Sequence, residues 1–322
     1  MKAIRFEKTG GPEVLDYVDV DLPPPGPGQA RVKHTVIGVN FIDTYHRSGL
    51  YKLPLPSGLG SEAAGVVDAV GAGVTTLKEG DRVAYAGAMG AYAEANNVPA
   101  DKLVKLPDGV GDEVAAAAML KGMTAQYLLK RTFAVQRGQT IVIHSAAGGV
   151  GLIAGQWAKH LGCTVIGTVG HDDKTALARA NGYDHVLSSH DADWPKQVRE
   201  LTKGAGVPVV YDSIGKDTFP ASLDALAVRG LLVSFGNSSG AVPAFEPGML
   251  AGKGSLYVTR PTLAHYTRNA QELQETADDL FAVLQSGAVK ITVNQRFKLS
   301  EARKAHEALH GRHTTGATVL VP

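Results

Sequence analysis

The pattern of apolar and polar positions changes near Thr124. Before that residue, the segments 30–39 and 64–70 are rich in β-branched side chains, the segment 79–86 follows a turn, and clusters of Pro and Gly punctuate this part of the chain. Close to the N-terminus, Ile4 and Phe6 alternate with charged neighbours, which is typical of a strand with one face in water. The first third is therefore predicted to be a compact antiparallel or barrel-like domain.

After Thr124, apolar stretches alternate with helical patterns. Nearly continuous apolar strands are typical of a parallel sheet that is covered on both faces, so we predict a doubly wound α/β domain. The last sixty residues predict a long helix near 268–286, a strand near 291–298, a shorter helix near 300–310 and a final strand at 317–321. The strands expected in the parallel sheet are 140–145, 164–170, 185–189, 207–213, 231–236 and 255–260.

Composition narrows the classes of function. A chain of 322 residues suits two domains, and its 32 basic against 31 acidic residues leave a net charge of +1. No dense Lys/Arg run is present, so neither nucleic acid nor a membrane surface is expected as a partner. The longest apolar stretch, 114–120, is far short of the ~18 residues of a membrane span, and 1–10 lacks the apolar region of a signal peptide, which predicts a cytoplasmic protein. The single cysteine, Cys163, excludes an internal disulfide and is expected to be a buried structural thiol.

The stretch 143-IHSAAGGVGLIAGQWAKHLG-162 runs from a strand through a glycine-rich turn into an amphipathic helix. A dinucleotide fingerprint needs glycine for a tight turn, for the approach of the pyrophosphate and for packing of helix on strand. Gly148 and Gly151 fill the second and third of these roles, whereas Ala146 stands in place of the first glycine. The setting predicts a bound dinucleotide at Gly148, Gly149 and Val150, and the alternative is a helix cap without a ligand.

The end of the next strand indicates which dinucleotide binds. An NAD site places an acid there for the ribose 2′-hydroxyl, but this strand ends at Gly170. Lys174 follows four residues later, where a cation can meet a 2′-phosphate, so NADPH is favoured. Two readings stay open at this point: 172-DD-173 can take a ribose hydroxyl, and Lys174 can be an ordinary surface lysine.

Seven segments in order along nearly the whole chain resemble the medium-chain dehydrogenase/reductase superfamily, and within it the zeta-crystallin-like quinone oxidoreductases. The resemblance implies a Rossmann NADPH-binding domain, 123–262, inserted in a β-rich GroES-like catalytic domain formed by 1–122 and 263–322. It also implies NADPH-dependent reduction of a quinone in an interdomain cleft, and a homodimer in which the strands 255–260 pair across a two-fold axis. The segments are 38–51, 58–67, 80–86, 121–129, 144–151, 235–240 and 254–261.

Zinc-dependent members of that superfamily carry Gly-His-Glu where this chain has Gly60-Ser61-Glu62, and their cysteine ligand corresponds to Asn40. Serine and asparagine are poor replacements for imidazole and thiolate, so no metal is expected and Glu62 should serve as a structural hydrogen-bonding group. A quinone is an electron-poor acceptor that needs hydrogen-bond donors more than a Lewis acid. Asn40, Tyr45 and Tyr51 are the candidate donors, although each tyrosine can equally be a half-buried ring with its hydroxyl in water.

Further cofactor contacts are implied by the resemblance. Ser189 lies where relatives can place a tyrosine near the adenosine phosphate, which weakens the NADPH assignment without removing it. Two other functions stay open: reduction of the double bond of an enone or alkenal, and a non-catalytic NADPH-binding role associated with RNA. The histidines His34, His144 and His171 are interpreted as structural or surface residues. The implied contacts are Phe41, Ile42, Asp43, Thr44, Tyr45, Thr124, Tyr127, Gly170, Lys174, Ser189, Ile214, Phe235, Gly236, Asn237, Ser238, Arg260 and Arg312.

Overall fold

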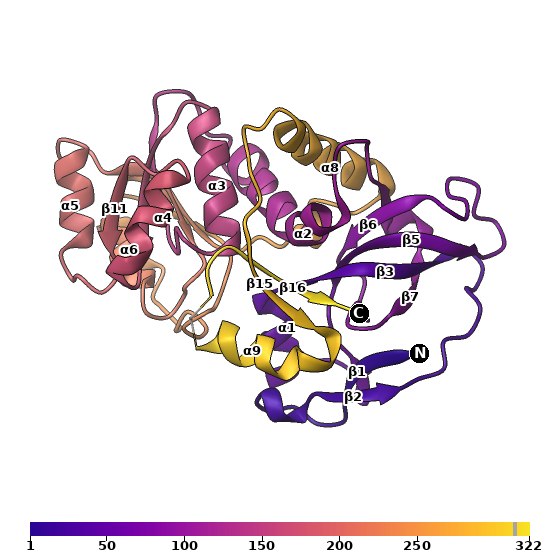
Figure 1. Ribbon diagram of the computed structural model, residues 1–322. Helices are drawn as coiled ribbons and strands as arrows, with labels where there is room; N and C mark the ends of the chain where they lie inside the picture. Colours follow the sequence, from indigo (N-terminus) through magenta and orange to yellow (C-terminus); the bar gives the residue numbers. More distant parts are fainter. Residues whose placement is uncertain (312–313) are drawn as a thin grey trace. The chain divides into compact units, whose positions relative to one another are not determined.

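The computed structural model describes residues 1–311 and 314–322. The chain folds into two compact units, a first formed by Met1–Met123, Thr267–Gln285 and Ile291–Pro322, and a second formed by Thr124–Tyr266 and Ser286–Lys290 (Figure 1). The short return to the second unit is fixed by Gln156, whose side chain donates to the Lys290 carbonyl at 3.1 Å and accepts from its N–H at 2.9 Å. No local sequence pattern predicts this return.

The first unit is built on a large sheet with the strand order β15-β16-β3-β5-β6-β8, and β7 also pairs with β3. Its neighbours are antiparallel except for β15 and β16, which run parallel. A smaller antiparallel sheet has the order β2-β1-β4. The strands are β1 (Lys2–Phe6), β2 (Asp16–Asp19), β3 (Gln29–Val39), β4 (Ser57–Gly58), β5 (Glu62–Val70), β6 (Arg82–Ala86), β7 (Ala95–Pro99), β8 (Val104–Lys105), β15 (Val293–Lys298) and β16 (Ala317–Val321).

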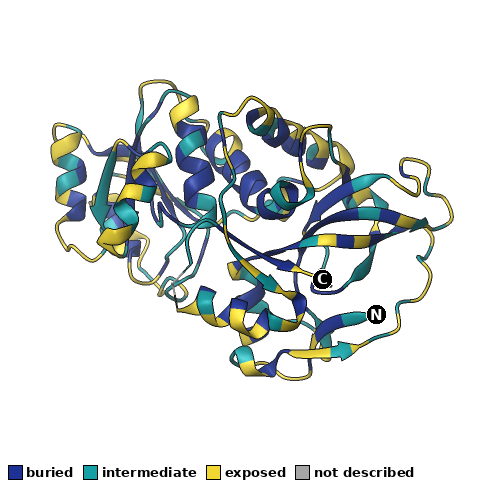
Figure 2. Cartoon of the chain, in the orientation of Figure 1, coloured by how far each residue is buried: buried dark blue, intermediate teal, exposed yellow. Residues whose placement is uncertain are grey.

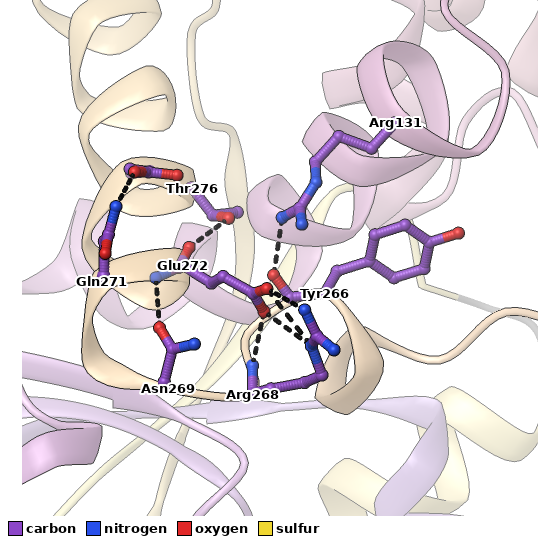
Figure 3. A network of polar contacts seen from close by, with 8 residues as sticks. Arg131, Tyr266, Arg268, Asn269, Gln271, Glu272 and Thr276 are labelled. Atoms are coloured by element: carbon purple, nitrogen blue, oxygen red, sulfur yellow. Dashed lines mark hydrogen bonds and ion pairs between the residues drawn. The ribbon is translucent and has the colours of Figure 1, made fainter.

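The helices of the first unit are α1 (Phe41–Ser48), α8 (Ala270–Gln285), α9 (Ala302–His310) and most of α2 (Asp112–Tyr127). Helix α8 has one buried and one exposed face (Figure 2), as its amphipathic pattern predicts. It begins after Asn269, whose side-chain oxygen accepts from the Glu272 N–H at 2.9 Å, and the Glu272 carboxylate pairs with Arg268 (Figure 3). Asn269 is thus the N-cap, and the ion pair joins the residue before the cap to the first turn of the helix.

The second unit contains a six-stranded sheet in the order β11-β10-β9-β12-β13-β14, with every neighbouring pair parallel. This is the order 3-2-1-4-5-6 of a Rossmann fold, in which ligands bind at the carboxyl edge where the order reverses, here between β9 and β12. The strands are β9 (Thr140–Ile143), β10 (Thr164–Val169), β11 (His185–Ser188), β12 (Val207–Asp212), β13 (Leu226–Ser234) and β14 (Tyr257–Thr259), and the helices are α3 (Gly149–His160), α4 (Thr175–Ala180), α5 (Trp194–Leu201), α6 (Phe219–Asp224) and α7 (Gly248–Gly252).

The predicted elements agree with the structure except at particular ends. Strand β13 begins five residues before the predicted start, because Val228 and Arg229 are exposed and the strand's first half lacks a continuous apolar pattern. Helix α1 was not predicted, since its eight residues include three that are buried and polar or charged rather than apolar. No helix within residues 1–311 and 314–322 is long and apolar enough to cross a membrane.

Candidate active site

The glycine-rich turn joins β9 to α3 in the second unit. Gly148 precedes the first turn of α3, and no side chain caps that end of the helix. A Cβ atom at Gly151 would overlap the Ser145 carbonyl oxygen, so the helix packs against the turn at a distance that only glycine allows. The Tyr183 hydroxyl donates to the Gly151 carbonyl at 2.6 Å and fixes this contact. The arrangement fits a dinucleotide, because the first N–H groups of α3 can bind a pyrophosphate.

Ala146 replaces the first glycine of the fingerprint, and the neighbouring strand accommodates its methyl group. The Ala146 N–H donates to the Thr168 carbonyl at 2.9 Å, which holds the turn against β10. A Cβ atom at Gly167, in the middle of β10, would lie only 2.7 Å from the Ala146 methyl. The glycine that makes room for this turn is therefore in the next strand, and the alanine does not argue against a dinucleotide site.

The carboxyl ends of β10 and β11 bring together three predicted cofactor contacts. Gly170 follows β10, Ser189 follows β11, and the Ser189 N–H donates to the Val169 carbonyl at 2.8 Å. A Cβ atom at Gly170 would lie 3.6 Å from His190 Nε2 and 3.9 Å from Ser189 Oγ, so these two side chains border the strand end at van der Waals distance. Lys174 is half-buried at the end of the short helical turn that follows Gly170.

The carboxyl end of β12 is organised by the buried side chain of Asp212. This carboxylate accepts from the N–H groups of Ile214 at 2.8 Å and Gly215 at 3.0 Å, and from the Thr218 hydroxyl at 2.8 Å. Three local donors thus set the path of the turn that carries Ile214. Asp212 also accepts from Ser222, which in turn contacts His144.

The segment after β13 lies alongside that turn. The Phe235 N–H donates to the Asp212 carbonyl at 2.7 Å, and the Ser238 N–H donates to the Ser213 carbonyl at 3.2 Å. Arg260, after β14, donates to the Ser234 carbonyl at 2.7 Å. The structure therefore gathers at one edge of the sheet the predicted contacts Ile214, Phe235, Gly236, Asn237, Ser238 and Arg260.

Two further predicted contacts, Thr124 and Tyr127, lie near the end of α2 and are almost completely buried. The Tyr127 ring stacks on Tyr266 with the ring centroids 4.5 Å apart and an interplanar angle of 10°. Tyr266 is held by Arg131, which donates to its carbonyl at 2.6 Å (Figure 3), and by the Thr132 hydroxyl at 2.9 Å. Burial raises the pKa of Tyr127, so this phenol stays protonated.

In the first unit, Asn40 immediately precedes α1, which carries Phe41, Ile42, Asp43, Thr44 and Tyr45. The Tyr45 and Tyr51 rings form an edge-to-face pair with centroids 5.3 Å apart, and both residues are half-buried. The structure thus places the two candidate tyrosines together. Phe41 is exposed, whereas the Thr44 hydroxyl is buried and donates to the Phe41 carbonyl at 2.7 Å.

The Asp43 carboxylate faces the interior of the first unit. It accepts from the Asn40 N–H at 2.9 Å and from the Tyr92 hydroxyl at 3.0 Å, and burial raises its pKa to about 7. The same hydroxyl lies 3.0 Å from Nε2 of His306, whose pKa falls to about 3, mainly because of burial. Because the Asp43 side chain is fully buried, this residue can offer a cofactor only its backbone.

Glu62, at the start of β5, has the structural hydrogen-bonding role that was predicted for it. The carboxylate is fully buried and accepts from Asn40 Nδ2 at 2.7 Å, the Leu120 N–H at 2.6 Å and Lys121 Nζ at 3.1 Å. Sequence reasoning missed Lys121. The available signal was the only charged residue within the helical stretch 114–129.

The remaining candidates divide between structural and surface residues. His34 and His144 are buried and hydrogen-bonded through both ring nitrogens, and His171 is exposed, in agreement with the prediction. Cys163 is a buried free thiol whose pKa is raised by burial. Arg312 lies outside the described residues. Within 1–311 and 314–322, no group of three His, Cys, Asp or Glu side chains is placed to hold a metal.

Residues 26–108 match the family model of the alcohol dehydrogenase GroES-like domain, and residues 149–282 match the model named zinc-binding dehydrogenase. A GroES-like unit combined with this parallel sheet defines a medium-chain dehydrogenase/reductase. Relatives that match over the full length of the chain identify the family within this superfamily. The chain is 55% identical over 323 residues to a quinone oxidoreductase of Pseudomonas aeruginosa, covering 100% of this chain and 99% of that protein.

Two other relatives also match over nearly the full length of both chains. The solved structure of Escherichia coli quinone oxidoreductase complexed with NADPH is 49% identical with a TM-score of 0.98, and 100% of each chain is covered. A 2-haloacrylate reductase of Burkholderia is 46% identical over 329 residues, covering 99% of this chain and 98% of that protein. The chain belongs to the quinone oxidoreductase family. The family and the fold class predicted from the sequence are confirmed.

Proposed function

We propose that this protein is an NADPH-dependent quinone reductase. The observation that carries the proposal is the turn at Gly148 and Gly151, where an uncapped helix end and a helix–strand contact without a Cβ atom prepare a site for a pyrophosphate. The relatives support the choice of cofactor and substrate, because one is a quinone oxidoreductase whose structure holds NADPH. The strand end at Gly170 carries no acid, and Lys174 follows four residues later, which agrees with a 2′-phosphate.

Each unit has a proposed role. The second unit binds NADPH through Gly148, Gly149, Val150, Gly170, Lys174, Ser189, Ile214, 235–238 and Arg260, with Thr124 and Tyr127 supporting it. The first unit binds the quinone and supplies Asn40, Tyr45 and Tyr51 as hydrogen-bond donors. The segment 41–45 contributes contacts to the cofactor, in the case of Asp43 through its backbone.

Bound NADPH supplies the hydride. As the quinone accepts it, negative charge develops on the ring oxygens, and a phenol or amide donor stabilises that charge without giving up its proton. Asn40 and Tyr45 therefore orient the substrate and stabilise charge. The hydroquinone anion that results then takes one proton from the solvent, because a phenol with a pKa of about 10 is protonated at neutral pH.

We also propose that the reaction proceeds without zinc. Asn40 Nδ2 and Lys121 Nζ both donate to the Glu62 carboxylate, so this buried carboxylate is already satisfied without a metal. Metal analysis of the purified protein should find no stoichiometric zinc, and a chelator should leave activity unchanged. About one zinc per chain with activity lost to the chelator would contradict the proposal.

The function is tested by following NADPH oxidation with a benzoquinone, an enone and 2-chloroacrylate in parallel. The highest kcat/KM is expected with the quinone. Greater activity on the enone or the haloacrylate would instead make the protein a double-bond reductase. The haloacrylate is included because a 2-haloacrylate reductase is 46% identical to this chain. NADPH binding with no oxidation by any acceptor would favour a non-catalytic role.

We further propose a homodimer formed through β14. This strand is at an edge of the six-stranded sheet, Tyr257 on it is 60% exposed, and Val228 close by is 74% exposed. An apolar edge invites pairing with a second copy. Light scattering at micromolar concentration should give twice the chain mass, and Tyr257→Lys should shift it toward the monomer. Leu201→Lys, at another exposed apolar position, is the control and should remain dimeric.

A further inference from the structure

The buried group formed by Asn40, Glu62 and Lys121 determines how Asn40 can act. Its centre is the Glu62 carboxylate, in which one oxygen, Oε2, accepts from both Asn40 Nδ2 at 2.7 Å and Lys121 Nζ at 3.1 Å. The other oxygen accepts from the Leu120 N–H at 2.6 Å. The Lys121 side chain is only 7% exposed and that of Glu62 is not exposed at all, so water screens this pair little.

The bond to Glu62 fixes the orientation of the Asn40 amide. If the amide were reversed, its carbonyl oxygen would face a carboxylate oxygen, and neither atom could donate. The backbone of Asn40 is held as well, because its N–H donates to Asp43 at 2.9 Å. The Nδ2 group carries two protons and Glu62 uses one of them, which leaves one proton to donate elsewhere.

Lys121 balances the charge of this arrangement. A buried carboxylate without a counter-charge is costly, and it would also repel an oxyanion that develops nearby. With the ammonium on the same oxygen, Glu62 can orient Asn40 while the pair as a whole remains neutral. Two hydrogen bonds thus connect Lys121 to the amide of a candidate substrate donor, although the lysine itself does not contact it.

We propose that Glu62 and Lys121 are positioning residues for hydride transfer: they hold the Asn40 amide so that its second Nδ2 proton points to the quinone oxygen that gains charge. This inference rests on the proposed quinone reductase function. It assigns to Lys121 an effect on the chemical step that passes through Asn40, and none on the binding of NADPH.

The test is a double-mutant cycle with Lys121→Met and Asn40→Ala, in which methionine keeps most of the lysine stem and removes the charge. For each variant, kcat and KM with a benzoquinone, the Kd of NADPH by fluorescence and the Tm are measured. Lys121→Met should lower kcat about 10-fold when Asn40 is present and less than about 2-fold in the Asn40→Ala background, with the Kd unchanged. The loss in Tm reports the structural cost of each substitution and is compared with the loss in kcat. Lys33→Met, at an exposed position of β3, is the control and should resemble the unmodified protein.

Equal fold-losses of kcat in the two backgrounds would overturn the proposal, and so would a Tm loss with unchanged kcat. If Lys121→Met does not fold, the neutral pair Glu62→Gln with Lys121→Met replaces it, and the same dependence on Asn40 is required. Lys121→Arg should restore most of kcat, because it restores the charge on Glu62. The two proposals fail differently: absence of quinone reduction by the unmodified chain overturns the function, whereas quinone reduction that is insensitive to Asn40→Ala overturns this inference together with the donor role of Asn40 and leaves the function standing.

Discussion

The candidate site residues of the two units are held in place by different physical means. In the second unit, the candidate cofactor-binding residues depend on backbone geometry: Gly148 leaves a helix end uncapped, and a Cβ atom at Gly151 or Gly236 would overlap a carbonyl oxygen of the facing segment. In the first unit, the candidate donor Asn40 depends on side chains, because it is held by two buried carboxylates, Glu62 and Asp43. A site made of backbone should be sensitive to added volume, whereas one made of buried ionisable groups should be sensitive to charge and pH.

The largest effect is expected from volume added to the second unit. The Gly151→Ala methyl would overlap Ser145 O and lie 2.9 Å from Ala146 O, and backbone atoms cannot move aside singly. We expect the free energy of unfolding to fall by about 3 kcal/mol, with weaker NADPH binding because the turn must open. Chemical denaturation and fluorescence titration measure the two effects. Gly248→Ala, where no atom lies within 4 Å, is the control, and equal behaviour of the two variants would show that the turn tolerates a side chain.

Within the same unit, substitution of Lys174 tests whether side-chain charge, in addition to backbone geometry, contributes to cofactor binding. Lys174→Ala should raise KM for NADPH by about 10-fold to 150-fold, since a hydrogen bond to a charged group contributes roughly 1.5–3 kcal/mol. KM for NADH should change little, because NADH lacks the 2′-phosphate. Lys196→Ala on α5, an exposed position, provides the comparison. Equal losses for both cofactors would place the Lys174 side chain away from the 2′-phosphate.

The contrast between backbone geometry in the second unit and buried side chains in the first also explains which features the sequence predicts well. The glycine turn and the alternation of strands and helices are local patterns, so the parallel sheet and its cofactor edge follow from a few residues at fixed spacing. Ala146 departs from the glycine fingerprint, and Gly167 leaves room for its methyl group. The sequence alone did not connect these two residues.

The contacts that define Asn40 are distant in the chain. Glu62 and Lys121 are 59 residues apart, and Tyr92 and His306 are 214 residues apart, so no periodicity relates them. Asp43 was predicted as a cofactor contact because it belongs to the segment 41–45, but its side chain points inward to Tyr92. Polar side chains that join separate elements are visible only after the chain has folded.

The buried groups of the first unit predict a specific dependence of stability on pH. The pKa of His306 is lowered to about 3 by burial and by Arg47, whereas in the unfolded chain it returns to about 6.5. Below pH 6.5 the unfolded state therefore binds a proton that the folded state does not, and the contribution of His306 to stability is lost as the pH falls. The destabilisation caused by His306→Gln should shrink by about 1.4 kcal/mol between pH 7.5 and pH 5.5.

Urea denaturation of both proteins at the two pH values measures this change. Asp43 contributes with the opposite sign, because its pKa is raised to about 7 and its folded form gains a proton as the pH falls. For that reason the variant is compared with the unmodified protein at each pH. His265→Gln, at an exposed position, is the control, and a His306→Gln effect that is constant with pH would show that His306 is not kept neutral by the fold.

The smallest effect is expected where a donor acts on the substrate without an obligatory proton transfer. Tyr45→Phe removes one hydroxyl and leaves the edge-to-face contact with Tyr51 in place. Loss of a neutral donor is worth about 0.5–1.5 kcal/mol, so kcat/KM for a benzoquinone should fall roughly 2-fold to 13-fold, with an unchanged profile between pH 6 and 9. Tyr17→Phe, on an exposed ring, should have no effect. A fall beyond about a thousandfold, together with loss of one limb of the pH profile, would make Tyr45 a general acid, and the first unit would then contribute chemistry as well as orientation.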